Sequence, residues 1–164
     1  MYLILSDIHG SSEGIKLIEK AIARFRPEGI LSAGDQCPDM LNASFYSSLI
    51  SVRGNCDRFY EYMNIAFPPV SRELNIYGHR TVMTHGDKFA PEDFSLHTGD
   101  IFISGHTHVP LLFEEKGIYY CNPGSPSRPR SSEGPSAALL SEDGMELFSL
   151  LDFSIFSAIR FSRS

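Results

Sequence analysis

The chain has 164 residues, of which 42% are hydrophobic and 21% are charged, and its formal net charge is -6. This composition is that of an ordinary globular protein, and it excludes a disordered or low-complexity chain. Because nonspecific affinity for nucleic acid depends on clustered Lys and Arg, the negative charge argues against a nucleic-acid partner.

Length and cysteine content indicate one domain in a reducing compartment. A chain of this size buries roughly two-thirds of its extended surface, so we expect residues 1–164 to form a single domain. The three cysteines form no Cys-x-x-Cys pair, which disfavours a disulfide framework and a zinc ribbon. We find no signal-peptide pattern and no apolar run near the roughly 20 residues that span a bilayer. We therefore expect a cytoplasmic protein without a membrane partner.

The first third of the chain alternates strand-like and helix-like segments. Residues 2–6 have the pattern of a buried strand, and residues 13–25 carry apolar side chains at spacings of three and four, which predicts a helix. Ser11 or Ser12 is its expected N-cap. We next expect a strand at Ile30, a short helix over 40–49 and a strand over 50–53. Such alternation predicts parallel β-α-β units.

Beyond Pro68 and Pro69 the pattern changes to short strands. The stretch ELNIYGHRTVMTHG predicts two strands about a turn at Gly78. The stretches DIFISGHTH, GIYYCNPGS, SAALLS and MELFSLL follow as further strands, separated by Gly, Pro or Asp-Gly. The sequence therefore predicts an α/β first half joined to a strand-rich second half.

Polar residues follow five of these apolar segments, always beside a glycine. The segments are LILSDIHG, GILSAGDQ, ISVRGNCD, TVMTHGD and DIFISGHTH. Because ligands of α/β sheets gather at the carboxyl ends of the strands, we expect the five loops to meet at one edge. The polar side chains that would converge there are Asp7, His9, Asp35, Asn55, His85, His106 and His108.

This set of ligands suits two metal ions. Two carboxylates, one amide oxygen and four imidazoles are too many for one four-coordinate zinc, but they fit two divalent ions that share a bridging carboxylate. Two ions about 4 Å apart are typical of enzymes that hydrolyse phosphate esters. In such sites one ion holds and acidifies a water, and both neutralise charge on the phosphoryl oxygens.

Each motif alone also has an ordinary structural explanation. Asp-x-His and the dipeptides GD and GN are common in turns. The stretch GHTH is more specific, because two histidines at positions i and i+2 of a strand share a face and can chelate a metal. We expect His79, in the hairpin turn, to be structural, and the role of His97 stays open.

Together the five motifs resemble those of the calcineurin-like metallophosphoesterases, most closely their small YfcE-like phosphodiesterase branch. The family series DxH, GD, GN, H and GHxH appears here as DIH at 7–9, GD at 34–35, GNCD at 54–57, HG at 85–86 and GHTH at 105–108. The stretch NPGS at 122–125 also fits that branch, so the resemblance covers almost the whole chain. It implies an α/β, four-layer fold in which a two-sheet β sandwich is flanked by helices.

The resemblance also divides the ligands between the two ions. The first ion would be held by Asp7, His9, Asp35 and His108, and the second by Asp35, Asn55, His85 and His106. Asp35 would be the bridge, and Asp35, Asn55 and His106 are the expected catalytic residues. The family implies manganese as the metal, and nickel, cobalt, zinc or iron can substitute.

Five further residues are candidates near the site. Cys56 stands where many relatives have a histidine that assists the leaving group, so its thiol either donates a proton or is only a small loop residue. Asp57 and Asp87 are expected to orient ligands by hydrogen bonds. Arg128 and Arg130 either bind a substrate phosphate or lie on a solvated surface.

We therefore expect a metal-dependent phosphodiesterase that acts on a small phosphodiester. The alternative is a non-catalytic scaffold for protein interactions that retains the metal site, as in the related Vps29 proteins. A mononuclear zinc hydrolase is disfavoured by the surplus of ligands. The sequence leaves open the physiological substrate, the native metal and whether the protein is a homo-oligomer.

Overall fold

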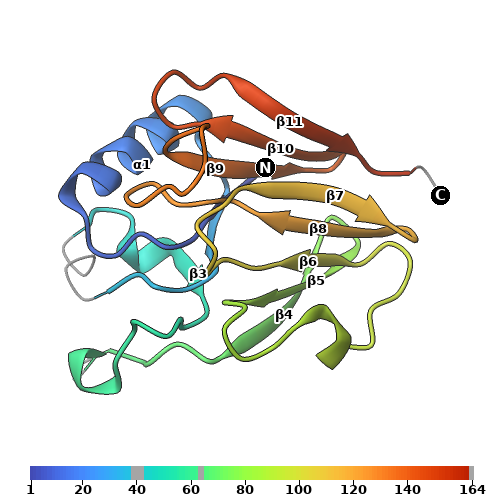
Figure 1. Ribbon diagram of the computed structural model, residues 1–164, viewed down its shortest axis with the longest axis horizontal. Coiled ribbons are helices and arrows are strands. Elements are labelled where there is room, and N and C mark those ends of the chain that lie inside the picture. The colour runs from blue at the N-terminus through green and yellow to red at the C-terminus, as the bar shows by residue number, and fades with distance from the viewer. Residues whose placement is uncertain (38–42, 63–64, 163–164) are drawn as a thin grey trace.

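The computed structural model describes residues 1–37, 43–62 and 65–162, which form two mixed β-sheets (Figure 1). The strands of the first sheet are β1 (Tyr2–Leu5), β2 (Gly29–Ser32), β3 (Leu49–Ser51), β9 (Ser136–Ser141), β10 (Gly144–Ser149) and β11 (Ile155–Arg160). Those of the second are β4 (Ser71–Ile76), β5 (His79–Thr84), β6 (Ile101–Ile103), β7 (Leu111–Glu115) and β8 (Ile118–Asn122). Their spatial orders are β11-β10-β9-β1-β2-β3 and β4-β5-β6-β8-β7.

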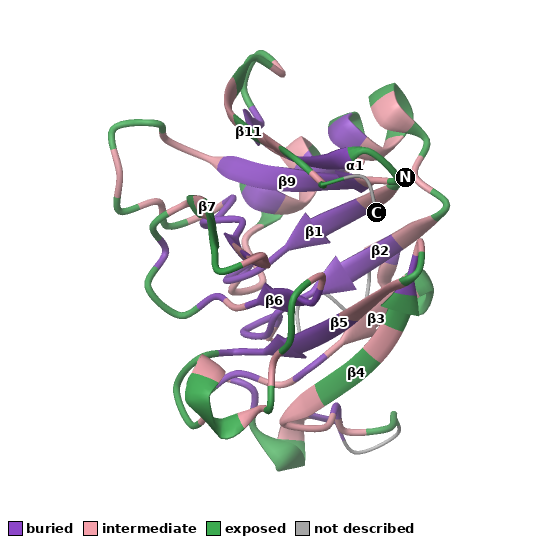
Figure 2. Ribbon diagram, turned by 90° about the vertical axis from the view of Figure 1, so that its right-hand side faces the viewer, coloured by how far each residue is buried: buried purple, intermediate pink, exposed green. Residues whose placement is uncertain are grey.

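The main core lies between the two sheets, as the expected sandwich requires. Ile4 and Leu31 of the first sheet pack in one buried cluster with Met83, Ile101 and Ile103 of the second. In Figure 2 the central strands β1, β2 and β6 are buried, whereas β4 is largely exposed. Because side chains alternate along a strand, the same strands also present apolar residues to their outer faces.

Helix α1 (Ser12–Phe25) covers the outer face of the first sheet. Ile18 and Ala21 pack with Leu3 and Leu5 of β1, whose side chains point away from the other sheet. Of the two candidate N-caps, Ser11 is the actual one, because its hydroxyl accepts a hydrogen bond from Gly14 N at 3.2 Å. No described helix is long and apolar enough to cross a membrane.

The predicted hairpin about Gly78 is confirmed. Strands β4 and β5 are antiparallel with Ile76 opposite His79, and the two turn residues, Tyr77 and Gly78, have φ of 53° and 84°. Two positive φ angles in a two-residue loop are typical of a type I′ turn, which matches the twist of the strands. The other strands expected from the sequence are also present, whereas β7 and β11 were not predicted.

The predicted helix over 40–49 is wrong for the part that the structure describes. Residues 46–48 form only a 3-10 turn, η2 (Tyr46–Ser48), and Leu49 already begins β3; residues 38–42 lie outside the described chain. Serines disfavour a helix because their hydroxyls bond to other partners, and Ser44 Oγ donates to Glu19 Oε1 at 2.8 Å. The other 3-10 turns described are η3 (Phe59–Tyr62) and η4 (Pro91–Asp93).

Strand direction places the polar loops together. Strands β1, β2 and β3 are mutually parallel, as are β5, β6 and β8. Their carboxyl ends are joined by backbone hydrogen bonds between loops: Asp7 N to Gly34 O at 3.0 Å and His9 N to Asp35 O at 2.9 Å within the first sheet. Gly105 N donates to His85 O at 2.9 Å in the second sheet. The five loops therefore meet at one end of the sandwich.

Candidate metal centre

A first group of four metal-competent atoms comes from Asp7, His9, Asp35 and His108. Asp7 Oδ1 lies 3.2 Å from His108 Nε2 and 3.9 Å from His9 Nε2, and the two imidazole nitrogens are 3.3 Å apart. Asp35 Oδ2 lies 3.7 Å from His9 Nε2. Carboxylate oxygens and imidazole nitrogens are common metal ligands, and atoms at this spacing lie close enough together to bind one cation.

Three further candidate ligands are His85, Asn55 and His106. His85 Nε2 is 3.4 Å from Asp35 Oδ2, so this one oxygen faces histidines of both groups. Asn55 Oδ1 and His106 Nδ1 are 3.1 Å apart and come from the loops after β3 and β6. His85 Nε2 also lies 4.0 Å from Asp7 Oδ1, so His85 approaches both carboxylates. The candidate ligands are therefore close together at one edge of the sandwich, and Asp35 is common to the two ligand sets that the family resemblance implies.

Two of the histidines are fixed in the orientation of metal ligands. His85 Nδ1 donates to Ala33 O at 2.8 Å, and His108 Nδ1 donates to Arg128 O at 2.7 Å. Such bonds commit Nδ1 to the backbone and leave Nε2 to face the centre, as in most metal-binding histidines.

Unpaired buried atoms support the same interpretation. Asp7 Oδ1 and His85 Nε2 are both fully buried, and neither has a hydrogen-bond partner among the described residues. The other carboxylate oxygen of Asp7 is satisfied by Ser6 Oγ at 2.7 Å and by His106 N at 3.0 Å. Leaving a buried polar atom unpaired costs about 1–3 kcal/mol. A bound cation would remove that cost, so the residues present fit a metal.

The backbone of the site is strained. Five of the candidate ligands have φ in the left-handed region, with 54° at Asp7, 50° at His9, 54° at Asp35, 68° at His106 and 61° at His108. Asp and His tolerate this region better than most residues, but each such residue still costs about 1–3 kcal/mol. Strain of this kind gathers where function dictates the conformation.

The charges of the site are coupled through Asp35 and His85. Burial opposes ionisation of both groups, but their proximity outweighs it: the pKa of His85 is raised to about 9 and that of Asp35 is lowered to about 2. Without a metal, His85 is therefore an imidazolium at neutral pH. Burial raises the pKa of Asp7 and lowers that of His9.

Asp57 is buried and holds two of the ligand loops. Its Oδ2 accepts hydrogen bonds from Asp35 N at 2.8 Å and Gly54 N at 2.9 Å. Its Oδ1 accepts from Cys37 N at 2.9 Å and from the Tyr62 hydroxyl at 2.8 Å. Asp57 therefore fixes backbone next to the ligands rather than a ligand side chain.

The other sequence candidates lie at varying distances from the centre. Cys56 lies beside it: its N–H donates to Asp35 Oδ1 at 2.8 Å, and burial and Asp35 raise the pKa of its thiol to about 11. Asp87 is exposed and makes no hydrogen bond to a candidate ligand among the described residues. His97 lies away from the ligands beside Asp100, with 77% of its side chain exposed. His79 packs on Phe161 and bonds to Gly99 O, a structural role.

A supporting network around the ligands was not predicted. Asn122 Nδ2 donates to Gly105 O at 2.8 Å, and Ser125 Oγ donates to Asp7 O at 2.7 Å. A Cβ added at Gly54 would lie 2.0 Å from Asp35 Oδ1, and one at Gly105 would lie 1.8 Å from Ser6 Oγ. The glycines of the motifs and the stretch NPGS were visible in the sequence, but their roles depend on contacts between distant segments.

An open hollow of about 190 Å³ gives access to the ligands. It is lined by His9, Asp35, Asn55, Cys56, His106, His108, Arg128 and Arg130. The two arginines therefore lie at the rim of the metal centre, where guanidinium groups can reach a bound phosphate.

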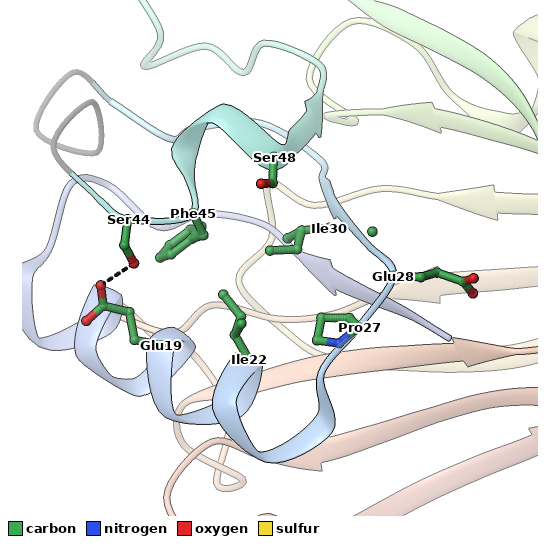
Figure 3. Close-up of a pocket in the computed structure, with 9 residues that line it drawn as sticks. Glu19, Ile22, Pro27, Glu28, Ile30, Ser44, Phe45 and Ser48 are labelled. Carbon is green, nitrogen blue, oxygen red and sulfur yellow. Dashed lines mark hydrogen bonds between the residues drawn. The ribbon is translucent and has the colours of Figure 1, made fainter.

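A second cavity, of about 370 Å³, lies at the opposite ends of the strands, between α1, β2 and η2 (Figure 3). Its charged lining residues are Glu19 and Glu28, and Glu19 is bonded to Ser44. Because its lining, in the described part of the chain, contains two carboxylates and no basic side chain, this cavity is poorly suited to a phosphate.

The fold and the site together define a class of protein, a two-sheet sandwich with an Asp and His metal-binding edge. The model of the calcineurin-like phosphoesterase superfamily domain matches residues 1–145, and the chain belongs to this superfamily.

The relatives agree with this assignment. The chain is 28% identical over 177 residues to phosphodiesterase YfcE of Escherichia coli strain K12, covering 96% of each chain. It is 34% identical over 154 residues to a probable metallophosphoesterase of Methanothermobacter thermautotrophicus, covering 88% of this chain and 87% of the relative.

Solved structures show the same fold. The structure of YfcE from E. coli superposes with a TM-score of 0.88 at 27% identity, covering 98% of this chain and 99% of the other. Vacuolar protein sorting 29 from Cryptosporidium parvum gives a TM-score of 0.74 at 19% identity, covering 99% and 97%. The second likeness concerns the fold alone.

Proposed function

We propose that this protein hydrolyses a small phosphodiester at a centre of two divalent metal ions. The observation that carries the proposal is the position of Asp35, whose Oδ2 lies 3.7 Å from His9 Nε2 and 3.4 Å from His85 Nε2. The similarity to YfcE, a phosphodiesterase, supports the same reaction class.

The residues of the two sets would hold the ions. Asp7, His9 and His108 would bind the first, Asn55, His85 and His106 the second, and Asp35 would bridge them. Two ions in such a site supply an acidified water as the nucleophile and offset charge on the phosphoryl oxygens. Manganese is our first choice of metal, with nickel, cobalt, zinc or iron as substitutes, because mixed N and O ligands accept all of these.

The remaining residues would position the substrate and the ligands. Arg128 and Arg130 at the rim offer guanidinium groups to the non-bridging phosphoryl oxygens. Asn55 is exposed and lies beside His106, so its amide is available to the substrate as well as to an ion. Asp57 would hold the loops that carry Asp35 and Asn55 through the backbone N–H groups of Asp35 and Gly54.

A scaffold that retains the metal site without catalysis is less well supported, since the chain combines seven metal-competent ligand positions with similarity to a phosphodiesterase. We further infer that residues 1–164 act as one domain and that the protein works in the reducing cytoplasm. The three free thiols, Cys37, Cys56 and Cys121, suit that compartment.

Metal analysis of the purified protein, combined with a panel of phosphodiesters and phosphomonoesters, tests the proposal. We expect two equivalents of divalent metal and metal-dependent hydrolysis that favours diesters. One equivalent of metal bound by cysteine, or full metal occupancy without any hydrolysis, would contradict it.

A further inference from the structure

An aromatic hollow lies on the outer face of the second sheet, against the metal centre. It has a volume of about 300 Å³. Its side walls come from β6, β7, β8 and the loop before η4, and its aromatic lining residues are Phe89, Phe102, Phe113 and Tyr120. We call this cavity the aromatic pocket.

Three of the lining rings and the adjacent Phe94 pack against one another in series. Phe113 stacks on Tyr120, with ring centroids 4.6 Å apart and planes at 8°. Tyr120 contacts Phe102 at 6.2 Å, and Phe102 contacts Phe94 at 5.9 Å. Phe113 and Leu111 at the mouth are 37% and 53% exposed. The pocket is therefore an open apolar surface rather than a closed core.

The pocket and the metal centre share a wall. Gly105 and Thr107 line the pocket, and His106 between them lines the hollow above the ligands. Gly86 also lines the pocket, directly after His85; a Cβ added there would lie 3.9 Å from His106 Cβ. A group in the aromatic pocket would thus contact residues that are the direct chain neighbours of two candidate ligands, His85 and His106.

This shared wall is held rigidly. Asn122 Nδ2 donates to Gly105 O at 2.8 Å and to Thr107 Oγ1 at 3.1 Å. The same Thr107 oxygen accepts a hydrogen bond from Val109 N at 3.3 Å. These hydrogen bonds tie the loop after β6, which carries His106, to the end of β8.

The residues on the two sides of the shared wall differ in charge. Arg128 and Arg130 belong to the hollow over the ligands, whereas none of the described residues that line the aromatic pocket is charged. Burial, with Glu115 and Glu92, raises the pKa of Tyr120, which disfavours a negative charge on this lining residue. An anion is thus favoured on the arginine side, and an uncharged ring is favoured on the aromatic side.

We propose that the aromatic pocket binds an uncharged ring carried as one ester substituent of the phosphodiester, while the phosphate lies over the ligands. The inference rests on the proposed function and names its substrate class: diesters with an aryl or base-like ring. An apolar cavity of about 150 Å³ already holds one benzene, so the volume suffices for a single or fused ring.

The test measures binding of three probes to the metal-loaded protein by calorimetry: diphenyl phosphate, dimethyl phosphate and inorganic phosphate. We expect the wild-type protein to bind diphenyl phosphate about tenfold more tightly than dimethyl phosphate. The variant Phe113→Ala should reduce this preference by about three- to tenfold, because the stacked wall is lost.

Two further variants sharpen the comparison. Ala90→Phe adds a ring to a lining position and should reduce the same preference by obstruction. Leu151→Ala removes an apolar side chain that is 65% exposed outside the pocket and should leave it unchanged. Inorganic phosphate should bind equally to all four proteins. A phenyl preference that is absent, or that survives both Phe113→Ala and Ala90→Phe, overturns the subsite.

Failure of the proposed function would be seen separately. In that case inorganic phosphate does not bind and no diester is hydrolysed by the wild-type protein. Titration of the protein with phenol, which carries no phosphate, then tests the pocket. NMR signals of Phe113 and Tyr120 that shift on addition of phenol support the subsite, and unmoved signals overturn it.

Discussion

The carboxylate of Asp57 holds the backbone of Asp35 in place: Asp57 Oδ2 accepts the Asp35 N–H at 2.8 Å. The same carboxylate bonds to Gly54 N and to Cys37 N, so it ties the loop after β2 to the loop after β3. Because Asp35 has a left-handed backbone, this contact stabilises a conformation that the residue would otherwise leave.

We therefore predict that Asp57→Asn weakens metal binding by about 10- to 100-fold. An amide of the same shape offers one acceptor oxygen, so at least one backbone N–H loses its partner, at a cost of about 1–3 kcal/mol of stability. Metal titration and thermal unfolding measure the two effects. Asp143→Asn, at an exposed position, is the control. Unchanged metal affinity would show that Asp57 has no positioning role.

Replacement of Asp35 with Ala should lose both metal ions, because its Oδ2 is common to the two ligand sets. Hydrolysis should fall by about a thousandfold or more, since the metals supply several kcal/mol of transition-state stabilisation. Metal content by mass spectrometry and the hydrolysis rate check this prediction. Retention of one full equivalent in Asp35→Ala would exclude the bridging role.

For Asn55→Ala we expect a large loss of activity with little loss of stability. Asn55 is exposed, and such surface changes usually alter stability by about 0.5 kcal/mol or less. Its amide oxygen nevertheless lies 3.1 Å from His106 Nδ1 in the second ligand set. A melting curve beside a hydrolysis rate separates the two effects. A variant as active as the wild type would remove Asn55 from the site.

The metal-free protein should show a pH-dependent stability that arises from His85 and Asp35. The folded pKa of His85, about 9, exceeds its ordinary 6.5, so its contribution is complete below pH 6.5 and is lost as the pH rises through 9. The folded pKa of Asp35, about 2, is below 3.8, so its contribution is lost as the pH falls from 3.8 through 2. The pair thus contributes fully to the stability of the folded protein between pH 3.8 and pH 6.5.

Urea unfolding of the chelator-treated protein across this pH range measures the effect. His85→Gln should flatten the alkaline limb, and His97→Gln, at an exposed histidine, should leave it unchanged. Because metal binding requires a neutral imidazole, loading at neutral pH should also release a proton from His85. An alkaline limb that persists in His85→Gln would assign it to another group.

For Cys56 we predict the role of a bystander. Burial and Asp35 raise the pKa of the thiol to about 11, which makes it a weak proton donor. A series of diesters with leaving groups of different pKa should therefore give a steep dependence of rate in the wild type. The same slope is expected in Cys56→Ala. A steeper slope in the variant would identify the thiol as a general acid.

Much of this architecture could be predicted from local patterns in the sequence. The apolar spacing of residues 13–25 and the turn at Gly78 depend on neighbours in the chain, so α1 and the β4–β5 hairpin were expected. Strands β7 and β11 were missed because they lie at sheet edges, where half-exposed residues break the alternation of apolar and polar positions. The helix expected over 40–49 failed where Ser44 bonds across to α1.

The chemistry of the candidate ligands was determined by the sequence alone, because each motif pairs a metal-competent side chain with a glycine at the end of an apolar strand. Their grouping was decided only by tertiary structure. Asp35 and His85 are fifty residues apart in the chain, and their 3.4 Å approach depends on the packing of two sheets. The hydrogen bonds from Asp35 N and Cys37 N to Asp57 are likewise long-range contacts, as is the wall shared by His106 and the aromatic pocket, and no local pattern encodes them.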